Sequence, residues 1–293
     1  MGLSDMKCRV REKRFFLTLL VLCIAAWPAH GVGMEQTEER LLRTIDDARV
    51  PLARVLPDLE NVRVVFVGEV HDRQSHHMAQ LRVIKALKKA RGSLAIGLEM
   101  FRSESQPILD GWVDGKVRGD DFVRAYYENW NFPWDHYRDI FTYAKENTIP
   151  LIGLNLPRDI TLQVSRQGFS SLTSKQLREL PSVSCQVDTT YEAFIRRALG
   201  QHGHSGKSFT HFCQAQMLWD SVMAWNLLRF LEANPEHKIV VLAGNGHAWK
   251  RGIPAQIRRR SSIPYRVILP EIPGRLERAN VSLEDADYLW LAY

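Results

Sequence analysis

The sequence of 293 residues lacks the features that divide a chain into separate domains. Its middle has no Pro-, Ser- or Gly-rich stretch, no low-complexity tract and no internal repeat. With 45% hydrophobic and 25% charged residues, its composition is typical of a soluble globular protein. We therefore expect one large domain rather than two small ones.

The sequence also has little net charge. The formal charge is +6, and it falls to +3 when residues 1–31, with five basic and two acidic side chains, are removed. So mild an excess does not favour nucleic acid as a partner. The run Arg258-Arg259-Arg260 is therefore expected to be a solvated surface.

Long apolar runs are missing except near the start of the chain. Five basic residues between Lys7 and Arg14 precede the apolar run Phe15–Trp27, which is too short to span a bilayer comfortably. Ala29 and Gly31 are the small residues that signal peptidase reads. We expect a signal peptide over 1–31 and an exported domain over 32–293, in the periplasm or cell envelope. A lipid anchor at Cys23 is disfavoured, because Leu22 stands where a lipobox has a small residue.

Cysteine is scarce, and only Cys185 and Cys213 remain after cleavage. An oxidising compartment permits a disulfide between them, which would stabilise the fold by about 3 kcal/mol in the loop-entropy model. Two buried free thiols are the alternative. A structural zinc site is not expected, because no second CxxC or HxxxH pair accompanies them.

Short β-branched runs alternate with helical patterns along the chain. Strands are expected at 63–68, 94–100, 150–156, 238–244 and 265–269, with a final edge strand at 288–292. Helices are expected at 35–50, 75–90 and 210–233, and an aromatic-rich insert separates the second and third strands. This alternation predicts an α/β fold, with a mostly parallel central sheet flanked by helices on both faces and a helical insert or cap.

Polar residues of the kind that do chemistry stand at the ends of four expected strands. They are Glu69 and His71, Glu99, Asn155 with Arg158, and His247. Because the carboxyl ends of parallel strands meet at one edge, we expect these side chains to share one rim. Asp220 lies on the apolar helix at 210–233 and needs a partner, since burying a lone carboxylate is very costly.

The motifs GEVH (68–71) and GNGH (244–247) resemble the paired Gly-x-x-His signature of the Tiki superfamily, which includes metal-dependent proteases and erythromycin-esterase-like proteins. The stretches IGLEMF (96–101), WDHYRDIFTYAKE (134–146), PLIGLNLPR (150–158), HGH (202–204) and AQMLWDSVMA (215–224) are similar to its ChaN branch. The resemblance covers residues 60–271. It implies an exported, often lipid-anchored, haem-binding dimer with stacked haems. Its expected role is haem or iron acquisition beside an outer-membrane uptake system.

Haem binding requires an apolar slot, an iron donor and cations for the propionates. Within the resemblance, the candidate cofactor-binding residues are Tyr137, Tyr191, His204, Arg158 and Asn155. The first three are the candidate iron donors, and the sequence leaves the choice among them open.

Two other readings of the rim stay open. One is a Tiki-type metal-dependent hydrolase or peptidase, with a divalent ion held by His71, His247, Glu69, Glu99 and Asp220 and one carboxylate acting as general base. The other is a polar network that only stabilises the fold.

Overall fold

The structure is a computed structural model that describes residues 40–90, 92–183, 189–199 and 206–291. All of these residues belong to the second of two units of the chain, Glu38–Tyr293. The predicted signal peptide, Cys185 and His204 lie outside the described residues. Among the described helices, none is both long enough and apolar enough to span a membrane.

The described strands form one eight-stranded sheet in the order β2-β1-β8-β7-β3-β6-β4-β5. Their bounds are β1 Arg40–Arg43, β2 Ala48–Pro51, β3 Val64–Glu69, β4 Ser93–Arg102, β5 Leu151–Asn155, β6 His237–Gly244, β7 Tyr265–Pro270 and β8 Tyr288–Trp290. Strands β3 to β8 pair in parallel, and β1 is antiparallel to both its neighbours. The predicted mostly parallel α/β fold is confirmed.

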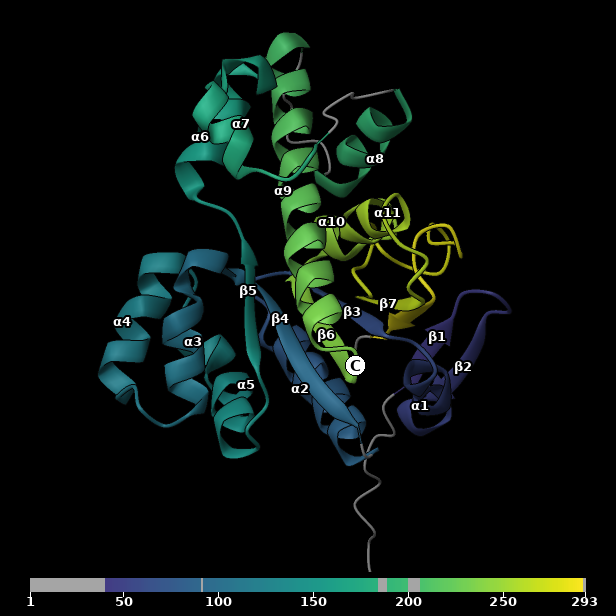
Figure 1. Cartoon of the computed structure of the whole chain (residues 1–293). Coiled ribbons are helices and arrows are strands. Elements are labelled where there is room, and N and C mark those ends of the chain that lie inside the picture. Colours follow the sequence, from purple (N-terminus) through teal and green to yellow (C-terminus); the bar gives the residue numbers. More distant parts are fainter. Residues whose placement is uncertain (1–39, 91, 184–188, 200–205, 292–293) are drawn as a thin grey trace, which may run out of the picture. The chain divides into compact units, whose positions relative to one another are not determined.

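Helices cover both faces of the sheet (Figure 1). One face carries α1 Leu52–Glu60, α2 Gln74–Lys89, α3 Gln106–Val113, α4 Gly119–Asn129 and α5 Trp134–Glu146. The other carries α8 Thr189–Leu199, α9 Gly206–Ala233, α10 Asn245–Ala248 and α11 Ile253–Arg258. Helix α6 Arg158–Gln167 packs against the first half of α9, beyond the strand ends, and α7 Ser174–Glu179 lies beside α6, where Gln176 bonds Gln163. Two short 3₁₀ helices are η1 Ser103–Ser105 and η2 Phe169–Ser171.

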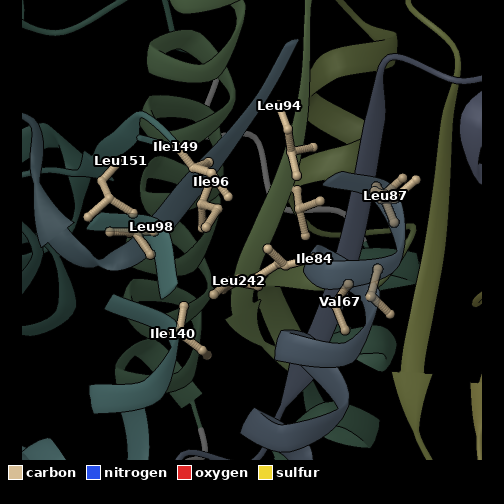
Figure 2. Packing of buried hydrophobic residues seen from close by; sticks show 14 of the residues in the cluster. Val67, Ile84, Leu87, Leu94, Ile96, Leu98, Ile140, Ile149, Leu151 and Leu242 are labelled. Atoms are coloured by element: carbon tan, nitrogen blue, oxygen red, sulfur yellow. The ribbon is translucent and has the colours of Figure 1, made fainter. Parts of the chain in front are cut away.

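The core beneath α2 and α5 shows why the strands were recognisable from sequence. Leu94, Ile96 and Leu98 of β4 point to this face, and Ile84 of α2 and Ile140 of α5 pack there (Figure 2). The intervening residues of β4 face the other helix layer. A strand buried on both faces reads as a continuous apolar run, and LAIGLEM is such a run.

The predicted opening helix at 35–50 is wrong. Residues 40–51 form the hairpin of β1 and β2, in which Asp47 has a left-handed φ of 57°. The Asp46 side chain accepts the Ala48 N–H at 3.3 Å, as in other Asx turns. Leu41 and Leu42 are both buried, on opposite faces of β1. Because both faces of β1 are buried, the strand lacks the usual alternation of apolar and polar residues. The spacing of the charged residues around it is that of an amphipathic helix, which led to the wrong prediction.

The final strand is not an edge strand. Strand β8 lies between β7 and β1, because the β1–β2 hairpin pairs with its outer side. The predicted position of this strand was correct to about two residues. Its pairing with β1 could not be predicted, because β1 lies near the other end of the chain and local sequence pattern gives no information on such a partner. The long helix α9 begins at Gly206, four residues before the predicted start.

Candidate functional site

The strand-end residues meet at one cavity. The carboxyl ends of β3, β4, β5 and β6 surround a space of about 500 Å³. All six strand-end candidates line it: Glu69, His71, Glu99, Asn155, Arg158 and His247. The predicted rim is therefore present in the structure, because β6 returns between β3 and β4 and brings the two Gly-x-x-His motifs together.

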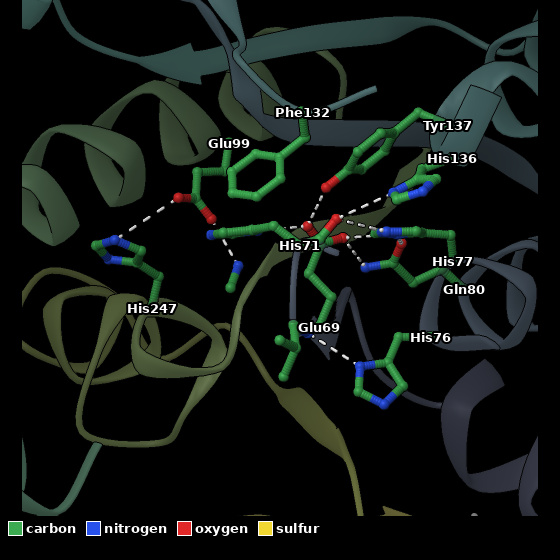
Figure 3. A network of polar contacts seen from close by, with 12 residues as sticks. Glu69, His71, His76, His77, Gln80, Glu99, Phe132, His136, Tyr137 and His247 are labelled. Atoms are coloured by element: carbon green, nitrogen blue, oxygen red, sulfur yellow. Dashed lines mark hydrogen bonds and ion pairs between the residues drawn. The ribbon is translucent and has the colours of Figure 1, made fainter. Parts of the chain in front are cut away.

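Glu69 is the centre of the first polar group (Figure 3). Its Oε1 accepts from His71 Nδ1 at 2.7 Å and from the Tyr137 hydroxyl at 2.5 Å. Its Oε2 accepts from Gln80 Nε2 at 2.8 Å and lies 3.2 Å from His77 Nδ1. Four donors thus surround one buried carboxylate. Burial would raise the pKa of Glu69, but the hydrogen bonds from His71 and His77 outweigh it and hold the pKa well below its ordinary value.

The second polar group joins Glu99, Asp220 and His247. His247 Nδ1 and Asp220 Oδ1 are 2.6 Å apart, and His247 Nε2 is 3.7 Å from Glu99 Oε1. Glu99 Oε2 accepts the Gly244 N–H at 2.6 Å. Both carboxylates are almost fully buried. The partner that Asp220 needed is therefore a strand-end histidine.

The second group places two buried carboxylates around one imidazole, and its pKa values reflect this. Burial raises the pKa of Asp220 to about 6, although the charge and hydrogen bond of His247 oppose this. Burial would lower the pKa of His247, but the charges of Glu99 and Asp220 raise it to about 9. His247 is therefore an imidazolium at neutral pH.

Two glycines of the motifs allow these groups to approach each other. A Cβ on Gly244 would lie 2.8 Å from Cε1 and 3.1 Å from Nε2 of His71. A Cβ on Gly68 would lie 2.5 Å from Oδ1 of Asn245. The glycines of GEVH and GNGH are thus required by close packing between the two motifs.

Aromatic rings wall the cavity. Trp130 and Phe132, from the aromatic-rich insert, each lie with ring centroids 4.9 Å from that of His71. The ring centroids of Trp219 of α9 and His247 are 4.8 Å apart. Four arginines also line the cavity, namely Arg102, Arg158, Arg197 and Arg275. The space therefore combines apolar walls with cations, which suits an organic anion.

The remaining candidates have different surroundings. Asn155 binds the Glu99 carbonyl at 2.7 Å and the Leu156 N–H at 2.8 Å, so it fastens β5 to β4. Tyr137 is 1% exposed, bonds to Glu69 and is not among the residues that line the cavity. Tyr191 of α8 is buried and contributes a hydrogen bond to Asp220. His204 lies outside the described residues.

Sequence reasoning missed His77 and Gln80. Both are buried on α2 and reach Glu69. A signal was available: they are three residues apart, so they share one helix face, and two buried polar groups on the helix after GEVH need a common partner.

A second hollow adjoins the cavity. A groove of about 680 Å³ lies between α6 and α9, and it shares Arg158, Thr161, Gln216 and Trp219 with the cavity. Leu162, Phe212 and Ala215 supply its apolar wall, and Arg166 its second cation. Within the described residues, the side chains of Arg158 and Arg166 have no hydrogen bond or ion pair.

The five residues proposed for a divalent ion lie in two groups, Glu69 with His71 and His247 with Asp220 and Glu99. In the part of the chain that the structure describes, no three His, Cys, Asp or Glu side chains are arranged to hold a metal ion. Each oxygen of Glu69 already has two donors around it, and Asp220 is engaged by His247. The divalent-ion site of the hydrolase reading stays a prediction.

The family model for haem-binding uptake proteins of the Tiki superfamily, ChaN, matches residues 55–257. The chain belongs to the ChaN family. ChaN of Campylobacter jejuni, solved with cofacial haem binding, has the same fold: the TM-score is 0.67 at 19% identity, over 87% of this chain and 96% of that one. A succinoglycan biosynthesis protein shares the fold at a TM-score of 0.50 and 15% identity, over 87% and 94% of the two chains.

A curated relative of this ChaN chain is a plant protein. Protein RETICULATA-RELATED 5, chloroplastic, of Arabidopsis thaliana is 24% identical over 287 residues, which cover 87% of this chain. The match spans 38% of the length of the plant protein. The similarity therefore concerns one part of that larger protein.

Proposed function

We propose that this ChaN chain binds haem in the groove between α6 and α9, and that it serves haem or iron acquisition. One observation carries the proposal: the groove has an apolar wall of Leu162, Phe212, Ala215 and Trp219, and toward each end of α6 stands an arginine that is unpaired among the described residues. The wall fits a macrocycle, and Arg158 and Arg166 fit two propionates, since guanidinium pairs well with carboxylate. Bound haem would supply an iron centre with redox chemistry.

The iron donor comes from the helical cap in this proposal. The residues that line the groove include no His, Tyr, Cys or Met among those described. His204 precedes α9 by two residues in the sequence, and Ser208 and Phe212 of α9 line the groove. Tyr191 on α8 is the second candidate. Tyr137 is the weakest, because its hydroxyl is buried against Glu69 and burial raises its pKa.

We further propose a dimer in which two grooves face each other, as the cofacial haems of the Campylobacter relative suggest. Leu162, in the groove wall, is 37% exposed, which supports a surface that is covered when haem and a second copy bind.

Hemin titration tests the haem proposal. The full chain is expected to bind hemin saturably, with a Soret band. Leu162→Arg should weaken the affinity by at least about tenfold, since it places a charge against the macrocycle. The matched control is Leu177→Arg on α7, which is also exposed and is not among the groove-lining residues. Equal affinities of the two variants, or no saturable binding, would contradict the proposed groove.

Ligand variants name the iron donor. His204→Ala should change the Soret position while the melting temperature stays the same. Tyr191→Phe should also change the Soret position, with a slightly lower melting temperature because its hydrogen bond to Asp220 is lost. Tyr137→Phe should bind hemin like the wild type. Sedimentation velocity with and without hemin tests the dimer. If all three variants keep the wild-type spectrum, none of these residues is the donor.

The site of action is part of the proposal. We propose export to the periplasm or cell envelope through the leader at 1–31, and N-terminal sequencing of protein from the native envelope should then start near Val32. The disulfide stays a prediction: the structure has Cys213 as a free, buried thiol on α9, and Cys185 is outside the described residues. Mass spectrometry should find the two joined; alkylation of both thiols would refute the bridge.

A further inference from the structure

The cavity and the groove are separated by a wall that two helices share. It consists of Arg158 and Thr161 of α6 with Gln216 and Trp219 of α9, and all four residues line both hollows. Helices α6 and α9 pack against each other through a common apolar cluster, which holds this wall in place. A molecule in either hollow therefore meets the same four side chains.

Two side chains of the wall are available to both hollows. Within the described residues, Arg158 and Gln216 make no side-chain hydrogen bond or ion pair. Arg158 is also exposed, so its guanidinium can turn to either side. A guanidinium that pairs bidentately with a carboxylate in one hollow is directed away from the other. Occupants of the two hollows therefore compete for Arg158.

The cavity has an excess of cationic side chains. Among the described residues, four arginines and two acidic residues line it. Arg102 and Arg197 are each held by a carboxylate from outside the lining, Glu104 at 2.8 Å and Asp285 at 3.1 Å. Arg158 has no such carboxylate. Its charge is therefore left for an anionic group of a ligand, and guanidinium favours a carboxylate.

The two acidic residues of the lining do not occupy this arginine. Four donors surround the carboxylate of Glu69. Glu99 Oε2 accepts the Gly244 N–H at 2.6 Å, and its Oε1 lies 3.7 Å from His247 Nε2. Both carboxylates are thus directed to donors of the strand ends, and neither forms an ion pair with Arg158.

The apolar walls of the cavity are aromatic on both sides of the sheet. Trp130 and Phe132 belong to the layer of α4 and α5, and their ring centroids are 5.4 Å apart. Trp219 and Trp249 belong to the layer of α9. All four rings line a space of about 500 Å³. A ligand that fills it is expected to have a flat aromatic body, because aromatic rings pack well on one another.

We propose that the rim cavity is a binding site for an aromatic carboxylate, whose carboxylate pairs with Arg158 and whose ring packs among the aromatic side chains. Because the bound carboxylate draws Arg158 to the cavity side, it removes one propionate partner from the groove. The ligand therefore antagonises haem. This antagonism rests on the proposed function, whereas the cavity site itself does not.

Calorimetric titration of the haem-free full chain with 2-naphthoate tests the site. Saturable binding is expected, and the neutral 2-naphthamide should bind at least about tenfold more weakly. Arg158→Ala should lower the naphthoate affinity at least about tenfold with an unchanged melting temperature, since this side chain is exposed. Arg166→Ala is the matched control, because Arg166 is an exposed arginine of the same helix that lines the groove and not the cavity. It should bind naphthoate like the wild type.

Variants of the two hollows locate the anion. Phe132→Leu, in the cavity, should lower the naphthoate affinity by about threefold to tenfold, because a ring contact is lost. Leu162→Arg, in the groove, should leave it unchanged. The reverse pattern would place the anion in the groove and overturn the proposal. Absence of saturable naphthoate binding, or equal affinities for naphthoate and naphthamide, would also overturn it.

Hemin titration in the presence of 2-naphthoate tests the antagonism. Saturating naphthoate should lower the hemin affinity of the wild type at least about tenfold, and hemin should lower the naphthoate affinity by the same factor. An unchanged hemin affinity would overturn the antagonism. If hemin does not bind while the naphthoate affinities follow the expected order, the groove proposal fails and the cavity site is supported.

Discussion

The two histidine–carboxylate pairs of the rim look alike in sequence and differ in balance. Glu69 has four donors around one carboxylate, whereas His247 has two carboxylates around one imidazole. The first arrangement stabilises a permanent negative charge. The second leaves Asp220 able to bind a proton and His247 charged. Similar motifs thus produce two different groups. On one face of the sheet Glu69 is a permanently charged carboxylate with its donors, which we call the anchor, and on the other face Asp220 and His247 form a titratable group.

The largest expected effect comes from removing the anchor. Glu69→Gln turns one carboxylate oxygen into a donor that faces the two donors around it, and it should cost about 3–5 kcal/mol of unfolding free energy, as when one partner of a buried pair is lost. Asp220→Asn should cost only about 1–2 kcal/mol, because Glu99 still faces His247. Urea unfolding of both variants measures the difference. A larger cost at Asp220 would reverse the comparison.

The titratable group should make stability depend on pH. His247 has a pKa raised from 6.5 to about 9, so its contribution is fully present below pH 6.5 and is lost as the pH rises toward 9. The unfolding free energy should fall over this range by on the order of 2 kcal/mol more in the wild type than in His247→Gln. Urea unfolding across pH 6–9.5 checks this. Parallel curves for the two proteins would refute the assignment.

The contact between the two groups can be broken by one methyl group. Gly244→Ala places a Cβ 2.8 Å from His71 Cε1 and should cost about 1–3 kcal/mol, because the ring must move. Gly92→Ala is the control, since nothing lies within 4 Å of its Cβ. Thermal unfolding compares the two variants. Equal melting temperatures would mean that His71 does not pack on Gly244.

These contacts also mark the limit of what sequence reveals. The parallel strands were predictable because buried β-branched runs are visible in the local sequence. The shared position of their polar ends was predictable because the carboxyl ends of parallel strands lie at one edge of the sheet. The β1–β2 hairpin was not, because Leu41 and Leu42 are buried on both faces. The roles of His77 and Gln80 depend on how α2 packs over β3, which no local spacing specifies.

The smallest expected effect concerns one donor of the anchor. Tyr137→Phe removes the hydroxyl that bonds Glu69 and keeps the ring. The ring centroid lies 4.1 Å from that of His77, and this packing is retained. Three donors remain, so the cost should be about 1 kcal/mol. Urea unfolding measures it. A cost similar to that of Glu69→Gln would mean that Tyr137 alone holds the carboxylate.

A crystal structure of the hemin complex tests the central claim most directly, namely that haem occupies the α6–α9 groove and leaves the rim histidines free. The account predicts the macrocycle against Leu162 and Phe212, with a propionate at Arg158 and no iron bond to His71 or His247. Iron bonded to Nε2 of either histidine, with the macrocycle inside the rim cavity, would contradict it.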